Sequence, residues 1–213
     1  RKMTTCLVNP RACFETELNY LPTDNPKKIA VVGAGPAGLQ FATIAAQRGH
    51  KVSLFDRAPE IGGQFNYAKR VPGKEEFYET LRYFNTMMKK HDIDVHLNTN
   101  ATVASLRDGG FDEVIVATGI KPRELNIPGI DSDKVLTYLD VLRDKKPVGE
   151  RVAVIGAGGI GFDVSEYLVY EGESPTLDLE EWLQEWGIDA LYNLPGGLLK
   201  EKSVEPAKRQ VTM

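Results

Sequence analysis

The chain has 213 residues, with 26 Lys and Arg against 30 Asp and Glu and a formal net charge of −4. This length allows one large domain or two small ones, and the 42% apolar content is typical of a globular protein. The charge balance argues against nucleic-acid binding, which depends on clustered Lys and Arg. No apolar run approaches the ~18 residues of a membrane helix. No secretory signal follows Arg1, so we expect a cytoplasmic protein without membrane contact.

The first part of the chain predicts a β-α-β unit. Residues 1–27 are polar and without periodicity, which indicates a linker. Residues 29–32 predict a short buried strand, and Pro36 stands where a helix would begin. An Ala-rich helix over 37–48 and an alternating strand over 51–55 complete the unit, which implies parallel strands. Residues 57–73 predict a loop, 74–91 an amphipathic helix, and 93–97 and 111–117 two further strands.

The same pattern returns further along the chain. After a short helix over 138–144, residues 151–155 predict a strand, 156–161 a glycine turn and 162–170 a helix. Such a unit normally returns with a strand about 20 residues after its turn. Here residues 171–206 carry scattered Pro and Gly, so we interpret them as an insertion, with the strand resuming at Arg209.

This repeat predicts an α/β fold with two Rossmann-like domains in tandem, as in disulfide-reductase-like flavoproteins. We expect an FAD-binding domain over 28–135 and the start of an NAD(P)H-binding domain over 136–213. The second domain is expected to be unfinished at Met213, so we expect the chain to be part of a longer protein.

The segment Gly33-Ala-Gly35-Pro-Ala-Gly38 fits the pattern G-x-G-x-x-G between a predicted strand and helix. The first glycine allows a tight turn, the second admits a pyrophosphate, and the third lets the helix pack closely. The helix N-terminus attracts the phosphates. Asp56, 23 residues after Gly33, is placed to bond the ribose hydroxyls and to repel a 2′-phosphate, which favours FAD or NAD. The alternatives are that the three glycines form only a tight turn and that Asp56 is only a solvent-exposed acid at the end of a strand.

Two further segments favour FAD in the first domain. Gly62-Gly63-Gln64 resembles the flavin-side loop of disulfide-reductase-like flavoproteins. The segment 115–119, which ends in Thr118 and Gly119, resembles the second fingerprint of these proteins, a strand whose end runs close to the FAD.

The later triplet, Gly156, Gly158 and Gly161, is expected to hold the pyrophosphate of a nicotinamide nucleotide. A purely structural repeat is the alternative. The residue that would select NADH or NADPH is expected to lie beyond Met213.

The remaining reactive side chains predict no catalytic residue. Cys6 and Cys13 form neither a CxxC motif nor a zinc site, and neither stands at a redox-disulfide position after the first βα unit. Flavoprotein disulfide-reductase chemistry is therefore not expected. The three histidines, His50, His91 and His96, lack a catalytic neighbour pattern and are assigned to surface or packing.

Several longer segments resemble one family, the bacterial NADPH-dependent 2,4-dienoyl-CoA reductases. These enzymes belong with the trimethylamine-dehydrogenase-like iron–sulfur flavoproteins. The segments are 6–13 (CLVNPRAC), 33–38 (GAGPAG), 61–65 (IGGQF), 72–83 (PGKEEFYETLRY), 138–144 (YLDVLRD) and 158–163 (GGIGFD).

This resemblance implies a longer enzyme with a TIM barrel holding FMN, a 4Fe-4S cluster, an FAD domain and an NADPH domain. Electrons would pass from NADPH to FAD, then through the cluster to FMN and to the dienoyl-CoA of β-oxidation. Cys6 matches a cluster ligand of the family. The positions that match family contacts to FAD are Ala37, Asp56, Gln64, Lys74 and Val103.

The chain would thus be the electron-input portion of such an enzyme, with the nucleotide cofactors and an upstream barrel domain as its partners. Two alternatives stay open. One is an adenine-nucleotide-binding module without redox turnover, and the other is the electron-input subunit of a glutamate-synthase-like complex.

Overall fold

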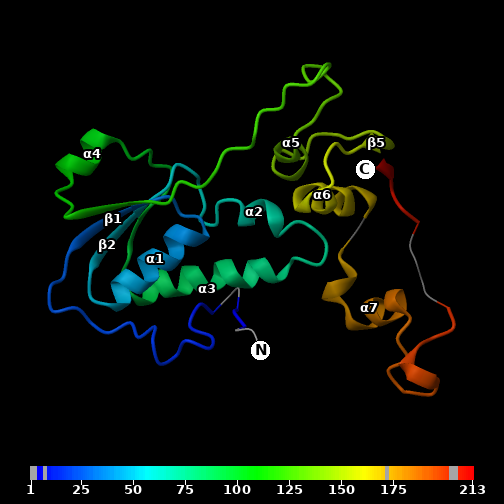
Figure 1. Cartoon of the computed structure of the whole chain (residues 1–213), viewed down its shortest axis with the longest axis horizontal. Helices are drawn as coiled ribbons and strands as arrows, with labels where there is room; N and C mark the ends of the chain where they lie inside the picture. The colour runs from blue at the N-terminus through cyan, green and yellow to red at the C-terminus, as the bar shows by residue number, and fades with distance from the viewer. Residues whose placement is uncertain (1–3, 7–8, 171–172, 202–205) are drawn as a thin grey trace. The chain divides into compact units, whose positions relative to one another are not determined.

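The computed structural model describes residues 4–6, 9–170, 173–201 and 206–213 (Figure 1). The chain forms two compact units. Unit 1 comprises residues 1–63 and 82–120, and unit 2 comprises residues 64–81 and 121–213. Parts of the expected linker and insertion lie outside the described residues.

Unit 1 is built on a four-stranded sheet in the order β3-β2-β1-β4, with every pair parallel. The strands are β1 (Lys28–Val32), β2 (Lys51–Phe55), β3 (Asp94–His96) and β4 (Glu113–Val116). In register, Val31 lies opposite Leu54 on one side and Ile115 on the other. The predicted α/β fold with a parallel Rossmann-like sheet is confirmed.

Helix α1 (Pro36–Gln47) packs along β1 and β2 and closes the core of unit 1 (Figure 1). Pro36 occupies the first helical turn, where its missing N–H is no loss. The small residues Gly38, Ala42 and Ala45 are buried on the face that packs, so the helix can lie close to the strands. Leu39, Val31 and Leu54 are fully buried between them.

Two helices, α3 and α4, differ from the helices that the sequence predicts. Helix α3 (Glu76–Lys90) begins two residues later than expected. A helix that was not expected, α4 (Val103–Asp108), begins at Thr102, whose hydroxyl accepts a hydrogen bond from the Ser105 amide, 3.1 Å away. The Thr102 amide in turn donates a hydrogen bond to the Ser105 hydroxyl oxygen, which completes a reciprocal cap.

Unit 2 contains a short parallel pair, β5 (Arg151–Ala153) and β6 (Gln210–Thr212). Helices α5 (Tyr138–Leu142) and α6 (Gly159–Val169) pack against one another, and α6 packs on β6 (Figure 1). The predicted return of a strand near Arg209 is confirmed. A short helix α2 (Phe65–Ala68) interrupts the expected loop over 57–73. The core consists of Val71, Val141, Leu142, Val164 and Leu168.

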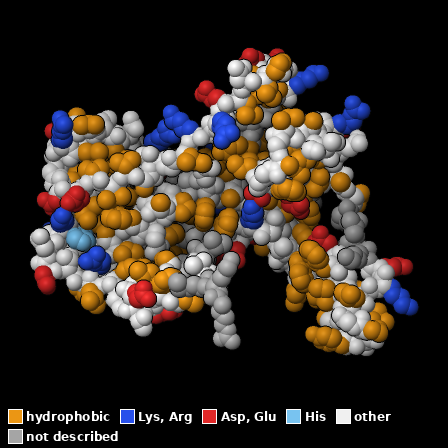
Figure 2. All heavy atoms as spheres, in the orientation of Figure 1, with side chains coloured by type: hydrophobic (Ala, Val, Ile, Leu, Met, Phe, Trp, Pro, Cys, Tyr) orange, Lys and Arg blue, Asp and Glu red, His pale blue; other side chains and the backbone are white. Residues whose placement is uncertain are grey.

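The expected insertion carries two 3-10 turns, η1 (Pro175–Leu177) and η2 (Pro195–Gly197), and helix α7 (Leu179–Trp186). Asp178 caps α7 by accepting hydrogen bonds from the amides of Glu180 and Glu181, and Gly187 ends it in the left-handed conformation. Apolar side chains gather on the surface around α7 (Figure 2). The exposed ones are Leu177, Leu179, Trp186, Leu191, Tyr192 and Leu198.

The division into units differs from the expected boundaries of 28–135 and 136–213. Residues 64–81 belong to unit 2, because Val71 is 2% exposed and packs in the core with Val141 and Leu168. Arg70 reinforces this packing by donating hydrogen bonds to the carbonyls of Leu142 and Arg143. The domain boundaries themselves stay a prediction. Among the described residues, no helix is long and apolar enough to cross a membrane.

Candidate nucleotide-binding turns

The strand order of unit 1 places two loops beside one another. Strand β1 has β2 on one side and β4 on the other. The chain adds β2 and β3 on one side of β1 and then crosses to the other side to add β4, so the order of the parallel strands reverses at β1. Ligands of open parallel sheets bind at such a reversal, outside the carboxyl ends of the strands. Gly33 follows β1, and Ala117 and Thr118 follow β4, so the two fingerprints predicted from sequence meet at this edge.

The first glycine turn (33–38) contains two glycines that the fold requires. Gly33 has φ of +112°, and a Cβ there would lie 2.2 Å from the Ala117 carbonyl oxygen. A Cβ on Gly38 would lie 1.9 Å from the Gly33 carbonyl oxygen. Both distances are far below van der Waals contact, so a side chain at either position would displace backbone.

Gly35, the middle glycine of the same turn, is not required by the fold. A Cβ there would meet no atom within 4 Å. Its φ and ψ of −77° and 178° are extended values that any residue adopts. The open space lies at the N-terminus of α1, where a pyrophosphate would approach the backbone. Packing therefore does not require glycine at position 35, and its contact with a ligand stays a prediction.

Asp56 lies at the end of β2 and is bonded to the first glycine turn. Its carboxylate accepts a hydrogen bond from the Ala34 amide at 2.6 Å and another from the Ala58 amide at 2.8 Å. A carboxylate has about four lone-pair sites, so it retains acceptor capacity for ribose hydroxyls. The hydrogen bond between Asp56 and the first glycine turn was not predicted from the sequence.

The loop at 61–63 lies against the first glycine turn. The Gly62 amide donates a hydrogen bond to the Ala34 carbonyl at 2.8 Å. Gly63 has φ of +55°, and a Cβ there would lie 3.1 Å from Gly35 Cα. Gly119, which follows β4, has φ of +74°. The structure thus gathers the first fingerprint, the second fingerprint and this loop on one edge of unit 1.

The N-terminus of α1 leaves its amides available. No side chain caps it, and its first turn holds no acidic residue that would compete with a phosphate. The first-turn residue Ala37 is exposed, whereas Gly38 is buried. The positive end of the helix therefore faces the open space at Gly35.

The second glycine turn (156–161) repeats this geometry in unit 2. A Cβ on Gly161 would lie 1.9 Å from the Gly156 carbonyl oxygen, the same contact as between Gly38 and Gly33. Gly156 has φ of +117°. Gly158 has extended angles of −91° and −179°, and a Cβ on it would meet nothing within 4 Å. Helix α6 also lacks a side-chain cap and has no acid in its first turn.

The other three candidate residues for FAD contacts are Val103, Gln64 and Lys74. Val103 is 67% exposed at the start of α4 in unit 1. Gln64 belongs to unit 2, where its side-chain oxygen accepts a hydrogen bond from the Tyr138 hydroxyl at 3.4 Å. Lys74 also belongs to unit 2. Their expected contacts to FAD stay predictions.

The Lys74 ammonium forms an ion pair with Asp163 that was not predicted from the sequence. It donates to both carboxylate oxygens of Asp163, at 2.5 and 2.6 Å. Asp163 lies on α6, just after the second glycine turn. The two residues are 89 positions apart, and no local pattern links them.

Cys6 and Cys13 are both exposed, and neither forms a disulfide within the part of the chain that the structure describes. Within the described ranges, no group of three or more His, Cys, Asp or Glu side chains could hold a metal ion. The assignment of Cys6 to an iron–sulfur cluster stays a prediction.

The two glycine turns are typical of dinucleotide-binding proteins, because each connects a strand of a parallel pair to a helix and has a middle glycine whose Cβ would meet no atom within 4 Å. Residues 27–183 match the family model of the pyridine nucleotide-disulphide oxidoreductases. The chain belongs to this family. Its two cysteines both precede β1, so it carries no redox disulfide after the first βα unit.

Similar proteins are reductases of greater length. The chain is 36% identical over 183 residues to a metal reductase of Desulforamulus reducens, covering 84% of this chain and 27% of that protein. It is 35% identical over 178 residues to a cinnamate reductase of Clostridium sporogenes, covering 81% and 26%. A solved 2-naphthoyl-CoA reductase matches with a TM-score of 0.74 and 36% identity, covering 78% of this chain and 25% of that one. The chain spans about a quarter of the length of these relatives.

Proposed function

We propose that the chain is the FAD- and NADPH-binding portion of a reductase that acts on an unsaturated acyl-CoA of the 2,4-dienoyl type. FAD would lie on the first glycine turn and NADPH on the second. The observation that carries the proposal is the open space at Gly35 and Gly158. In both turns the other two glycines are required by backbone geometry, whereas the middle one is explained by a bound pyrophosphate.

The acyl-CoA substrate is supported by two independent likenesses. The segments over 72–83 and 158–163 resemble the 2,4-dienoyl-CoA reductases. The solved relative is named for an aromatic acyl-CoA, and the cinnamate reductase for a conjugated carboxylic acid. The substrate and the FMN would be held outside this chain, and Cys6 would be the one ligand that this chain supplies to the 4Fe-4S cluster.

The residues of this chain would bind and orient the nucleotides. The amides at the N-terminus of α1 would donate to the pyrophosphate of FAD. The remaining lone pairs of Asp56 would accept from the ribose hydroxyls. The bound flavin would supply the exchange between two-electron nicotinamide chemistry and single-electron transfer.

A flavin titration tests the first assignment. Purified chain is incubated with FAD, passed through a desalting column and measured for flavin absorbance, with ADP binding followed in parallel by calorimetry. Retained FAD supports the proposal. A colourless chain that binds ADP would instead support the adenine-nucleotide module without redox turnover, and a chain that binds neither would refute both.

The substrate is tested in the longer protein that contains this chain. NADPH oxidation is followed with a 2,4-dienoyl-CoA, a 2-enoyl-CoA and free cinnamate as acceptors. Dependence on the dienoyl-CoA supports the proposal. Turnover with cinnamate but not with the dienoyl-CoA would contradict it.

A further inference from the structure

The segment around α7 presents apolar side chains to solvent, and we call this surface the α7 patch (Figure 2). Its members come from η1, from α7 and from the chain that follows α7, and each is more than half exposed. They are Leu177, Leu179, Trp186, Leu191, Tyr192 and Leu198. Single exposed apolar residues are ordinary, but a group of this size among polar residues marks an interaction surface.

Helix α7 itself carries one apolar stripe. Leu179 and Trp186 are seven residues apart, which is about two helical turns, and the half-buried Trp182 lies between them on the same face. The ring centroids of the two tryptophans are 6.1 Å apart. The middle of the stripe is therefore partly covered, whereas its ends, Leu179 and Trp186, are 71% and 56% exposed.

The turn that follows α7 is held by the buried Asp189. Its carboxylate accepts hydrogen bonds from the amides of Leu191 at 3.1 Å and Leu194 at 2.7 Å. The Asp189 amide donates to the Gly197 carbonyl at 2.8 Å. Polar bonds inside the segment therefore fix this turn, while Leu191 and Tyr192 remain 81% and 83% exposed.

Tyr192 stands in a backbone conformation that bulky residues rarely adopt. Its φ is +56°, in the left-handed region where glycine and asparagine are common. A Cβ on Gly197 would lie 3.5 Å from the Tyr192 ring, so the ring has one neighbour there but is otherwise open to solvent. Burial within the chain therefore does not account for an aromatic residue at this position. Tyr and Trp are enriched among the residues that dominate the binding energy of protein interfaces.

The segment that carries the α7 patch is acidic. Residues 171–206 contain nine Asp and Glu against two Lys, a net charge of −7, whereas the remainder of the chain carries +3. Glu180 and Glu181 lie in the first turn of α7, where the helix dipole favours an acid, but Glu185 lies in the last turn, where it does not. Among the residues that the structure describes, none of these three carboxylates forms an ion pair.

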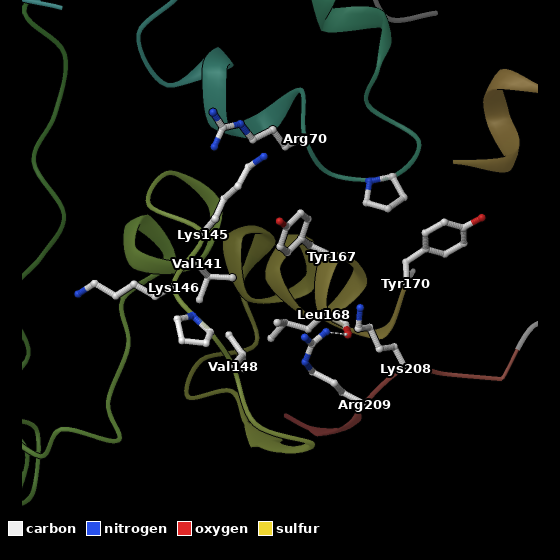
Figure 3. Close-up of a pocket in the computed structure, with 12 residues that line it drawn as sticks. Arg70, Val141, Lys145, Lys146, Val148, Tyr167, Leu168, Tyr170, Lys208 and Arg209 are labelled. Atoms are coloured by element: carbon white, nitrogen blue, oxygen red, sulfur yellow. Dashed lines mark hydrogen bonds between the residues drawn. The ribbon is translucent and has the colours of Figure 1, made fainter. Parts of the chain in front are cut away.

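The cationic side chains of unit 2 do not offset this charge locally. Five of its lysines and arginines lie instead around a cavity beside α5 and α6 (Figure 3). The α7 patch therefore combines exposed apolar groups with an excess of negative charge.

This combination narrows what can cover the α7 patch. Nucleotides, acyl-CoA thioesters, nucleic acids and anionic membrane surfaces are all negatively charged, so the patch repels them. Two copies related by a two-fold axis would bring the same acidic surface face to face, which like charges oppose. A polypeptide surface with apolar side chains among Lys and Arg matches both properties of the patch.

We propose that the α7 patch is a docking surface for a cationic amphipathic polypeptide segment outside this chain. Trp186 and Tyr192 pack against the apolar side chains of that segment, and Glu181 and Glu185 attract its Lys and Arg. The patch shares no residue with either glycine turn, so the proposal does not depend on nucleotide binding.

The two tryptophans of the chain both lie in α7, so intrinsic tryptophan fluorescence reports on the α7 patch alone. Three peptides of about 14 residues, or four helical turns, are titrated into the full chain, and none contains Trp. The first has Leu and Lys at helical spacing, the second has Glu in place of Lys, and the third has Ser in place of Leu. The Leu–Lys peptide is expected to give a saturable blue shift, with an affinity that falls as ionic strength rises. The other two are expected to bind at least tenfold more weakly.

The decisive variant is Tyr192→Asn, because it removes the ring and suits the left-handed backbone. Its thermal midpoint is expected to stay close to the parent value, while the affinity for the Leu–Lys peptide falls at least tenfold. Glu181→Gln combined with Glu185→Gln is expected to weaken binding and to reduce its dependence on ionic strength. Asp92→Asn removes an acid at a similar φ of +51° in unit 1 and is expected to leave the affinity unchanged.

Three results would overturn the proposal. The first is that the Leu–Lys peptide gives no saturable shift or binds no more tightly than the Leu–Glu peptide. The second is that Tyr192→Asn binds the Leu–Lys peptide as tightly as the parent. The third is self-association of the chain, measured by analytical ultracentrifugation, that Tyr192→Asn abolishes, which would assign the α7 patch to a second copy.

Discussion

Replacement of Gly35 by alanine is expected to affect nucleotide affinity and the stability of the fold differently. The added Cβ enters open space, and the extended backbone angles suit alanine. Such a Gly→Ala change reduces the freedom of the unfolded chain, which stabilises a protein by about 0.4–1 kcal/mol. Gly35 is also the N-cap of α1, a position that favours glycine over alanine, so this gain is offset and we expect the thermal midpoint to stay within roughly 4 °C of the parent value.

The same methyl group would stand where a pyrophosphate approaches the first turn of α1. Leaving polar groups unpaired costs about 1–3 kcal/mol, so we expect ADP affinity to fall roughly 10- to 100-fold. Calorimetric titration with ADP and thermal unfolding by circular dichroism measure the two effects on one sample.

Two further variants control this experiment. Gly149→Ala also enters open space without a left-handed φ, but outside either glycine turn. It is expected to leave ADP binding unchanged. Gly38→Ala would place its Cβ 1.9 Å from the Gly33 carbonyl oxygen, so it is expected to lower the midpoint. A Gly35→Ala protein that binds ADP as tightly as the parent would refute the assignment of Gly35 to a ligand.

Four other predictions follow from the described contacts. Gly158→Ala is expected to weaken NADPH binding while ADP binding at the first glycine turn persists, as measured by calorimetry. Asp56→Ala is expected to lose about 1–3 kcal/mol of ADP affinity and also some stability, since the Ala34 and Ala58 amides lose their acceptor; unchanged ADP binding would contradict the ribose assignment. Lys146 and then Thr137 hold the pKa of Asp140 well below its usual range. The resulting stability is fully present above the unfolded pKa of about 4 and is lost as pH falls toward the folded value; acid unfolding of Asp140→Asn should show a weaker pH dependence. Iron and sulfide analysis after anaerobic reconstitution is expected to find no cluster within one chain, because a four-iron cluster takes four thiolates and the chain has two cysteines.

The parts of the fold that sequence predicts well are those with strong local signals. The β-α-β unit was predicted to within a residue or so from the buried run at β1, Pro36 and the glycine spacing. Strand β2 has the expected bounds. The second glycine turn and the late return of β6 were predictable from the repeat. In both turns the glycine spacing predicted where the strand, turn and helix lie, and the nucleotide contacts of these residues stay predictions.

The features that escaped prediction depend on short or distant interactions. Helix α2 has four residues and α4 has six, too few for apolar periodicity to show. The cap of α4 uses Ser105 where the usual motif has Glu or Gln. The ion pair between Lys74 and Asp163 joins residues that are 89 positions apart, which no local sequence pattern records.

The central claim is that each glycine turn holds its own nucleotide, with FAD on the first. It is tested most directly by the amount of FAD retained per chain after gel filtration, measured from flavin absorbance for the parent, Gly35→Ala and Gly158→Ala. The account predicts about one FAD per chain for the parent and for Gly158→Ala, and a large loss for Gly35→Ala. Equal retention by Gly35→Ala and the parent, or loss of FAD only in Gly158→Ala, would contradict it.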